Sequence, residues 1–287
     1  MSLRDIGFGL ATAFGYGTAD YVAKRTTDKV GFVETYWYLE MVGVPLLVVL
    51  ALVPEHVASL PLNPLLLLLG LSAFNVAASF FLYRAFEFGT LSVVSPVASA
   101  YPALIVLLAV VVLHEALTVS EVVGIALTLV GVVLITRVTI GEVSRAKDYR
   151  LGIISAVVAF FGYGVFYFGL KVVVGPIPPI TSAAIVRLVS LAPVVLIAAN
   201  RGALHLPRKG LAWAAVTIGT LDSLALVAYN LGLVTGHSLA VLGTVSGLFS
   251  AVTVGWAVLL LKERLSLIQW VGAAAIFAGI ITLASGI

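Results

Sequence analysis

The chain has no cysteine and few charged residues. Without cysteine it can form no disulfide, no CxxC metal site and no thiol nucleophile. Charged residues make up 10% of the 287 positions, whereas about 25% is usual in a soluble domain. The sequence also shows no basic patch on a soluble domain, so we expect no nucleic-acid partner.

Most of the chain is apolar. Hydrophobic residues make up 61% of the chain, and the mean hydropathy is +1.17. A membrane-spanning helix needs roughly 20 mostly apolar residues. Ten segments meet this requirement: Ile6–Ala23, Val33–Val53, Pro64–Phe86, Leu91–Leu113, Val119–Ile135, Leu151–Val174, Ile180–Ala199, Leu211–Val234, Ser238–Leu261 and Leu267–Ser285. We therefore expect a multi-pass protein of the plasma membrane, monomeric or weakly dimeric in the lipid bilayer.

The two halves of the chain resemble each other in an ordered series of matches. Phe14-Gly15-Tyr16-Gly17 recurs as Phe161-Gly162-Tyr163-Gly164, and the same offset of 147 carries Lys24 onto Lys171. An offset of 148 carries Pro45 onto Pro193, and the pair Gly124 and Gly131 onto Gly272 and Gly279. These matches indicate a first repeat over residues 1–137, a connecting loop over 138–149 and a second repeat over 150–287.

Each repeat contains five spans, and five is an odd number. The second repeat must therefore enter the membrane from the opposite side, which makes the pair inverted. The predicted fold is all-α, with ten transmembrane helices in two inverted five-helix repeats. Inverted repeats place a substrate site near the middle of the bilayer and expose it alternately to either side.

Polar side chains recur at helical spacing within the apolar spans. A charge at mid-bilayer costs roughly 2.5–3.5 kcal/mol on insertion scales and usually faces protein or water. The first, third, sixth and eighth spans each carry such groups along one face, which is the arrangement expected around a shared water-filled cavity. The candidate substrate-binding residues are Tyr16, Asp20, Asn75, Ser79, Tyr83, Ser99, Tyr163, Tyr167, Asp222, Asn230 and Ser246. A simpler alternative is that Asp20 pairs with Lys24 and that the tyrosines bond locally.

Three further expectations concern charges inside the spans. Asp20 and Asp222 are candidates for proton coupling, because apolar surroundings favour the protonated form of a carboxyl group. A carboxylate at either position could instead bind a cationic substrate. Glu40 and Arg187 lie deep in the second and seventh spans, and we expect them to form a structural ion pair. We expect no cofactor and no metal site.

Two short turns carry a resemblance to a known family. Leu113-His114-Glu115-Ala116-Leu117-Thr118 recurs as Leu261-Lys262-Glu263-Arg264-Leu265-Ser266, and each is followed by the paired glycines. This pattern resembles the EamA repeat of the drug/metabolite transporter superfamily, although the first helices carry Tyr-Gly where the family has Trp-Gly. The resemblance covers the whole chain. It implies export or exchange of small metabolites through a cavity lined by the first, third, fourth, sixth, eighth and ninth helices.

The sequence therefore predicts a secondary carrier for small polar or amphipathic metabolites, such as amino acids or nucleosides. The alternatives are an uncoupled facilitator or channel and, less favoured, an intramembrane enzyme, for which clustered catalytic residues are missing. A P-loop, which an ATP-driven pump needs, does not occur. Thirteen of the 16 basic residues fall on the side opposite the termini. The positive-inside rule then places the termini outside, whereas the family resemblance places them in the cytoplasm.

Overall fold

The structure is a computed structural model that describes residues 3–52, 60–89, 97–98, 100–135, 148–261 and 266–285. The first repeat supplies α1 (Leu3–Val30), α2 (Phe32–Leu52), α3 (Leu62–Phe88), α5 (Tyr101–Val112) and α6 (Val119–Ile135). The second supplies α7 (Tyr149–Val173), α8 (Pro179–Asn200), α9 (Ala212–Thr235), α10 (Leu239–Ser246), α11 (Phe249–Leu261) and α12 (Leu267–Ser285). The described residues form no strand beyond one isolated bridge between Val174 and Ile177. The all-α expectation is confirmed.

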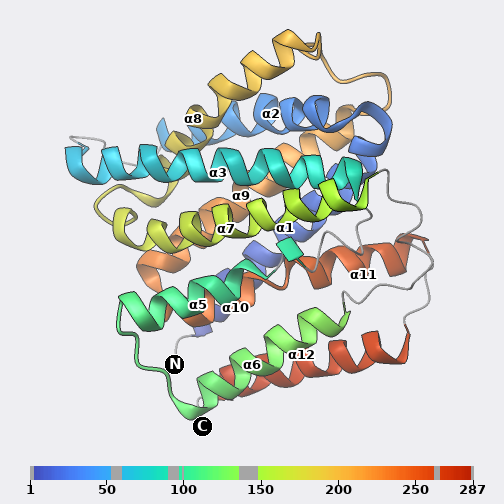
Figure 1. The fold of residues 1–287 in the computed structure, drawn as a ribbon. Coiled ribbons are helices and arrows are strands. Elements are labelled where there is room, and N and C mark those ends of the chain that lie inside the picture. The colour runs from blue at the N-terminus through green and yellow to red at the C-terminus, as the bar shows by residue number, and fades with distance from the viewer. Residues whose placement is uncertain are drawn as a thin grey trace.

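Helix lengths suit a bilayer. Five helices, namely α2, α3, α7, α8 and α9, are each long and apolar enough to cross a membrane. The start of α1 and the end of α12 lie near each other (Figure 1). An even number of crossings requires the two ends to lie on the same side of the membrane.

The ninth span is interrupted, which corrects the prediction of one helix over Ser238–Leu261. Its residues form α10 and α11, which are separated by Gly247 and Leu248. The backbone at Gly247 contacts the ring of Pro102, and a Cβ there would overlap that ring. The chain therefore bends where glycine permits a close approach to α5.

The fourth span is interrupted at the equivalent point. Val97 and Ala98 are helical, Ala100 forms a turn, and α5 begins at Tyr101. Pro102 thus lies in the first turn of α5, where its missing N–H has no helical partner to lose, rather than at a kink within a helix. The neighbouring Ser95, Pro96 and Ser99 lie outside the described residues.

The repeat is visible in the contacts between helices. A Cβ placed on Gly15 of α1 would lie 2.8 Å from the Cβ of Ala225 in α9. At the equivalent Gly162 of α7, it would lie 2.9 Å from the Cβ of Ala78 in α3. Both contacts keep the offset of 147. The α1/α9 and α3/α7 pairs are therefore equivalent copies of one close helix crossing that contains residues of both repeats.

Two other helix pairs join equivalent elements to each other. These are α2 with α8 and α6 with α12, which lie at opposite ends of the molecule, at the top and bottom of Figure 1. In a two-fold arrangement, an element can contact its own equivalent only on the axis. The pseudo-two-fold axis therefore runs from the α2/α8 pair to the α6/α12 pair, and the other helices lie between them.

The lysines that the repeat places in register also act alike. Lys24 of α1 donates to the carbonyl of Phe86 at 2.9 Å, and Lys171 of α7 donates to that of Leu233 at 3.2 Å. Each lysine satisfies a carbonyl in the last turn of a neighbouring helix, where cations are favourable. The inverted pair thus fastens α1 to α3 at one side of the membrane and α7 to α9 at the other.

The crossing of α6 and α12 depends on glycine. A Cβ on Gly279 would lie 2.8 Å from the carbonyl oxygen of Gly124 and would overlap the Thr128 hydroxyl. We expect Gly279→Ala to force the helices apart and to lower the melting temperature of the purified protein in detergent. Gly70→Ala is the matched control, because no atom lies within 4 Å of the added Cβ and alanine favours a helix. Equal melting temperatures for the two variants would contradict this account of the crossing.

Candidate functional site

A central cavity lies between the two repeats, on the pseudo-two-fold axis. About 520 Å³ of space lies between its side chains, including the part open to the outside. Helices α1, α3, α5, α7, α8, α9 and α11 contribute to its wall. The lining residues are Tyr16, Asp20, Asn75, Ser79, Leu82, Tyr83, Tyr101, Tyr163, Tyr167, Arg187, Asp222, Leu226 and Phe249.

Most of the candidate residues predicted from the sequence meet in this cavity. Those brought together are Tyr16, Asp20, Asn75, Ser79, Tyr83, Tyr163, Tyr167 and Asp222. The reason is the period of the helix. Residues four apart share one face, so each polar stripe turns toward the same space. Ser99 lies outside the described residues.

Two candidates lie away from the cavity wall. The Asn230 amide donates to the Pro179 carbonyl at 3.1 Å and to the Ser182 hydroxyl at 2.8 Å, which ties α9 to the start of α8. Ser246 is fully buried, and its hydroxyl donates to the Gly243 carbonyl at 2.9 Å. Their contact with substrate remains a prediction, and the bonds described here give both residues a local structural use.

Four tyrosines, Tyr16, Tyr101, Tyr163 and Tyr167, form a tyrosine cluster within the cavity. The Tyr167 ring is central. Its centroid lies 6.2 Å from that of Tyr16, 5.2 Å from that of Tyr101 and 5.9 Å from that of Tyr163. The Tyr163 hydroxyl donates to Ser79 of α3 at 3.1 Å. The cluster gives the cavity a wall that combines aromatic faces with hydroxyl groups.

Arg187 stands at the centre of the buried charges. Its Nη1 donates to Glu40 Oε1 at 3.2 Å, and its Nη2 is paired with Asp222. Glu40 also accepts a hydrogen bond from the Ser190 hydroxyl at 2.7 Å. The predicted pair between Glu40 and Arg187 is therefore present. Asp222 is a second carboxylate on the same guanidinium, and this contact was not expected.

Asp20 has different surroundings. Its side chain is 8% exposed, and among the described residues its carboxylate has no hydrogen bond or ion pair. Lys24 turns away from it and bonds Asp28 at 2.5 Å. The simpler alternative of a pair between Asp20 and Lys24 is therefore wrong. Asp20 faces the cavity as a carboxylate without a partner.

Sequence reasoning missed several lining residues, namely Tyr101, Phe249, Leu82 and Leu226, and it gave Arg187 only a structural use. Tyr101 and Phe249 are equivalent at the offset of 148, and their rings stack at 5.8 Å across the axis. Each begins a helix just after an interruption, so the bend itself directs the ring into the cavity. Pro102, next to Tyr101, was the available signal. The seventh span also enters the wall through Arg187, in addition to the helices that the family resemblance implies.

On the side where the termini lie, α5 and α10 pack against each other. A Cβ on Gly243 of α10 would lie 3.4 Å from the Cβ of Ile105 in α5. Glu115, in the turn after α5, accepts a hydrogen bond from the Ser238 hydroxyl at 2.5 Å. Ser238 is the N-cap residue of α10 and accepts from Val241 N. The glutamate of the repeated turn thus binds the start of a helix from the other repeat.

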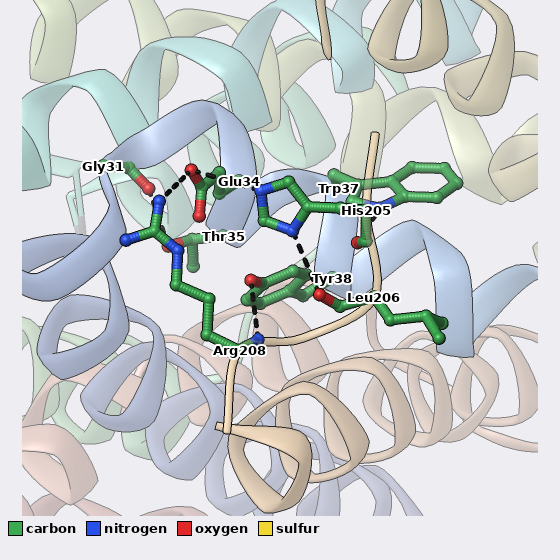
Figure 2. A network of polar contacts seen from close by, with 8 residues as sticks. All are labelled: Gly31, Glu34, Thr35, Trp37, Tyr38, His205, Leu206 and Arg208. Carbon is green, nitrogen blue, oxygen red and sulfur yellow. Dashed lines mark hydrogen bonds and ion pairs between the residues drawn. The ribbon is translucent and has the colours of Figure 1, made fainter. Parts of the chain in front are cut away.

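A second polar network lies outside the cavity, between the start of α2 and the loop before α9 (Figure 2). Glu34 contacts Arg208 Nη2 at 2.9 Å and His205 Nε2 at 3.5 Å. The Trp37 indole donates to the His205 carbonyl at 3.0 Å, and Tyr38 accepts from Arg208 N at 3.4 Å. These contacts fasten the loop to α2 at the membrane surface. They place no side chain in the cavity.

Comparisons with known proteins agree with this architecture. A family model described as the EamA-like transporter family matches residues 4–137 and, a second time, residues 150–285. An uncharacterized protein of Methanocaldococcus jannaschii is 28% identical over 128 residues, which make up 45% of this chain and 93% of that protein. A solved crystal structure aligns with a TM-score of 0.78 and 20% identity, covering 99% of this chain and 97% of the other. At that identity the likeness concerns the fold alone.

Glu40 lies behind the cavity wall, so we expect it to act on stability rather than on substrate. Glu40→Gln removes one of the two negative charges that offset Arg187 in a buried setting, where losing a partner typically costs several kcal/mol. The melting temperature should fall, and the folded fraction should keep its transport rate. Glu34→Gln serves for comparison. It should lower the free energy of unfolding by at most about 1 kcal/mol, because its partner Arg208 is 58% exposed. Loss of transport at unchanged stability would assign Glu40 to the transport cycle instead.

Proposed function

Because the chain belongs to the EamA-like transporter family, we propose that it is a secondary active carrier of the plasma membrane. Members of this family are multi-pass membrane transporters of the drug/metabolite superfamily rather than enzymes. The proposed substrates are small polar or amphipathic metabolites, such as amino acids or nucleosides. The proposed cycle exposes one central site alternately to the two sides of the membrane.

The observation that carries the proposal is the position of the cavity on the pseudo-two-fold axis. Residues of both repeats line it, and equivalent residues contact each other there, as Tyr101 and Phe249 do. A site on such an axis relates in the same way to either membrane face. Exchanging the conformations of the two repeats therefore moves its opening from one face to the other.

The contact between α5 and α10 supports a defined closed side. It combines the close approach of Gly243 to Ile105 with the hydrogen bond from Ser238 to Glu115. Both contacts join one repeat to the other, so they must separate when the site opens toward the termini. The contacts α1/α9 and α3/α7 are more extensive and are suited to persist through the cycle.

Locking this contact tests alternating access. The chain has no cysteine, so Ile105→Cys combined with Gly243→Cys introduces one pair of thiols. The Cβ separation of 3.4 Å is close to the roughly 3.5–4.5 Å that a disulfide requires. We expect oxidation to abolish counterflow in proteoliposomes and dithiothreitol to restore it.

The two single-cysteine variants are the controls and should transport equally with and without oxidant. Transport that survives complete cross-linking would exclude a cycle in which α5 and α10 separate. Flux that rises linearly with substrate, with no counterflow, would instead favour the uncoupled facilitator.

We also propose that transport is coupled to a proton carried by Asp20 or Asp222. The two carboxylates differ, because Asp222 is paired with Arg187 and Asp20 has no partner among the described residues. A carboxylate without a compensating cation is the one that gains most from protonation in apolar surroundings. We therefore expect Asp20 to have the greater effect on coupling.

Asp20→Asn and Asp222→Asn distinguish these two sites. In proteoliposomes with an imposed pH gradient, Asp20→Asn should lose gradient-driven accumulation of substrate, whereas Asp222→Asn should retain it in the folded fraction. Asp28→Asn, on the exposed part of the same helix, is the matched control. If both cavity variants keep accumulation driven by the pH gradient, neither carboxylate couples transport to protons.

A further inference from the structure

We propose that the carrier's substrate is a small organic cation whose ammonium group binds between the Asp20 carboxylate and the tyrosine cluster. This inference rests on the proposed carrier function and narrows its substrate class. Three features carry it: the unpartnered carboxylate, the aromatic wall beside it, and the balance of charge around the cavity.

The carboxylate is buried without compensation. Asp20 is 8% exposed, lines the cavity, and has no hydrogen-bond or ion-pair partner in the described part of the chain. A charged group in such a place is costly unless an opposite charge accompanies it. The nearest lysine on α1 is engaged by Asp28 and by the Phe86 carbonyl. When Asp20 is ionised, a cation from outside the protein can supply the compensating charge.

The aromatic wall suits an ammonium group. Tyr16 lies one helical turn before Asp20 on α1, and Tyr101, Tyr163 and Tyr167 line the same cavity. Neighbouring centroids in the cluster lie 5.2–6.2 Å apart, so a guest that contacts one ring is within reach of the next. A cation within about 6 Å of a ring centroid is attracted by the ring face, and several such rings together recognise substituted ammonium ions.

The charge balance disfavours an acidic substrate. Asp20, Asp222 and Glu40 supply three carboxylates around the cavity, and Arg187 is the only basic side chain among its described lining residues. Both terminal nitrogens of Arg187 are already paired, one with Glu40 and one with Asp222. A substrate carboxylate would have to displace one of these partners and would face the uncompensated Asp20. A substrate amine meets neither obstacle.

Three probes that share a phenyl ring but differ in their charged group isolate the effect of charge on binding. Phenethylamine carries an ammonium, 3-phenylpropionate carries a carboxylate, and phenylalanine carries both. Binding is measured as the rise in melting temperature of the purified protein, and transport is measured as counterflow in proteoliposomes. We expect the concentration of phenethylamine that gives half-maximal stabilisation to be at least about tenfold below that of phenylalanine, with 3-phenylpropionate weakest.

Variants of α1 locate the effect. Asp20→Asn should abolish the stabilisation by phenethylamine, Asp20→Glu should retain part of it, and Asp28→Asn, the matched control, should leave it unchanged. Equal or stronger binding of phenylalanine or 3-phenylpropionate by the unmodified protein overturns the inference, whatever the variants do. An effect of phenethylamine that persists in folded Asp20→Asn also overturns it. Stabilisation that depends on Asp20 but is not accompanied by counterflow would support the cation site and count against the carrier function.

Discussion

The guanidinium of Arg187 holds the centre of the molecule together. Glu40 lies on α2 and Arg187 on α8, the equivalent helix of the other repeat, and the two side chains meet where these helices pack together. Two like charges that faced each other across this helix pair would repel. An acid on one helix and a base on the other attract each other instead. Asp222 then joins the same cation from the cavity side.

Around this pair, close backbone contact replaces the hydrophobic driving force that lipid cannot supply. Gly15 and Gly162 bring α1 against α9 and α7 against α3, and Gly279 brings α12 against α6. Small residues allow such approach, and dispersion and polar contacts between the helices then become effective. The equivalence of the first two contacts shows that each repeat builds its tight crossing with the other repeat. Neither repeat therefore completes its packing alone.

Function is expected where the symmetry is broken. Asp20 corresponds to Tyr167, and Asn75 corresponds to Asp222, so the two walls of the cavity differ in charge although their backbones match. In the proposed cycle, equivalent helices exchange conformations, while the substrate meets one distinct set of groups. Tyr101 and Phe249 likewise occupy equivalent positions but differ in chemistry. Their rings stack across the axis, and only Tyr101 carries a hydroxyl. The proposal thus assigns the cycle to the shared architecture and the choice of substrate to the positions where the repeats differ.

The sequence by itself determined the ten spans, the duplication and, through the odd number of spans, the inversion. It also identified most of the cavity wall, because a period of four residues places Tyr16 and Asp20 on one face whatever they contact. Tertiary structure decided the remainder. The break at Gly247 follows from a neighbouring helix, and the pairing of Arg187 with Asp222 joins residues 35 positions apart on different helices. Asn230 belongs to a polar stripe, yet its amide bonds α8. Periodicity fixes the direction in which a side chain leaves its own helix. Which residue that side chain contacts depends on how the helices cross.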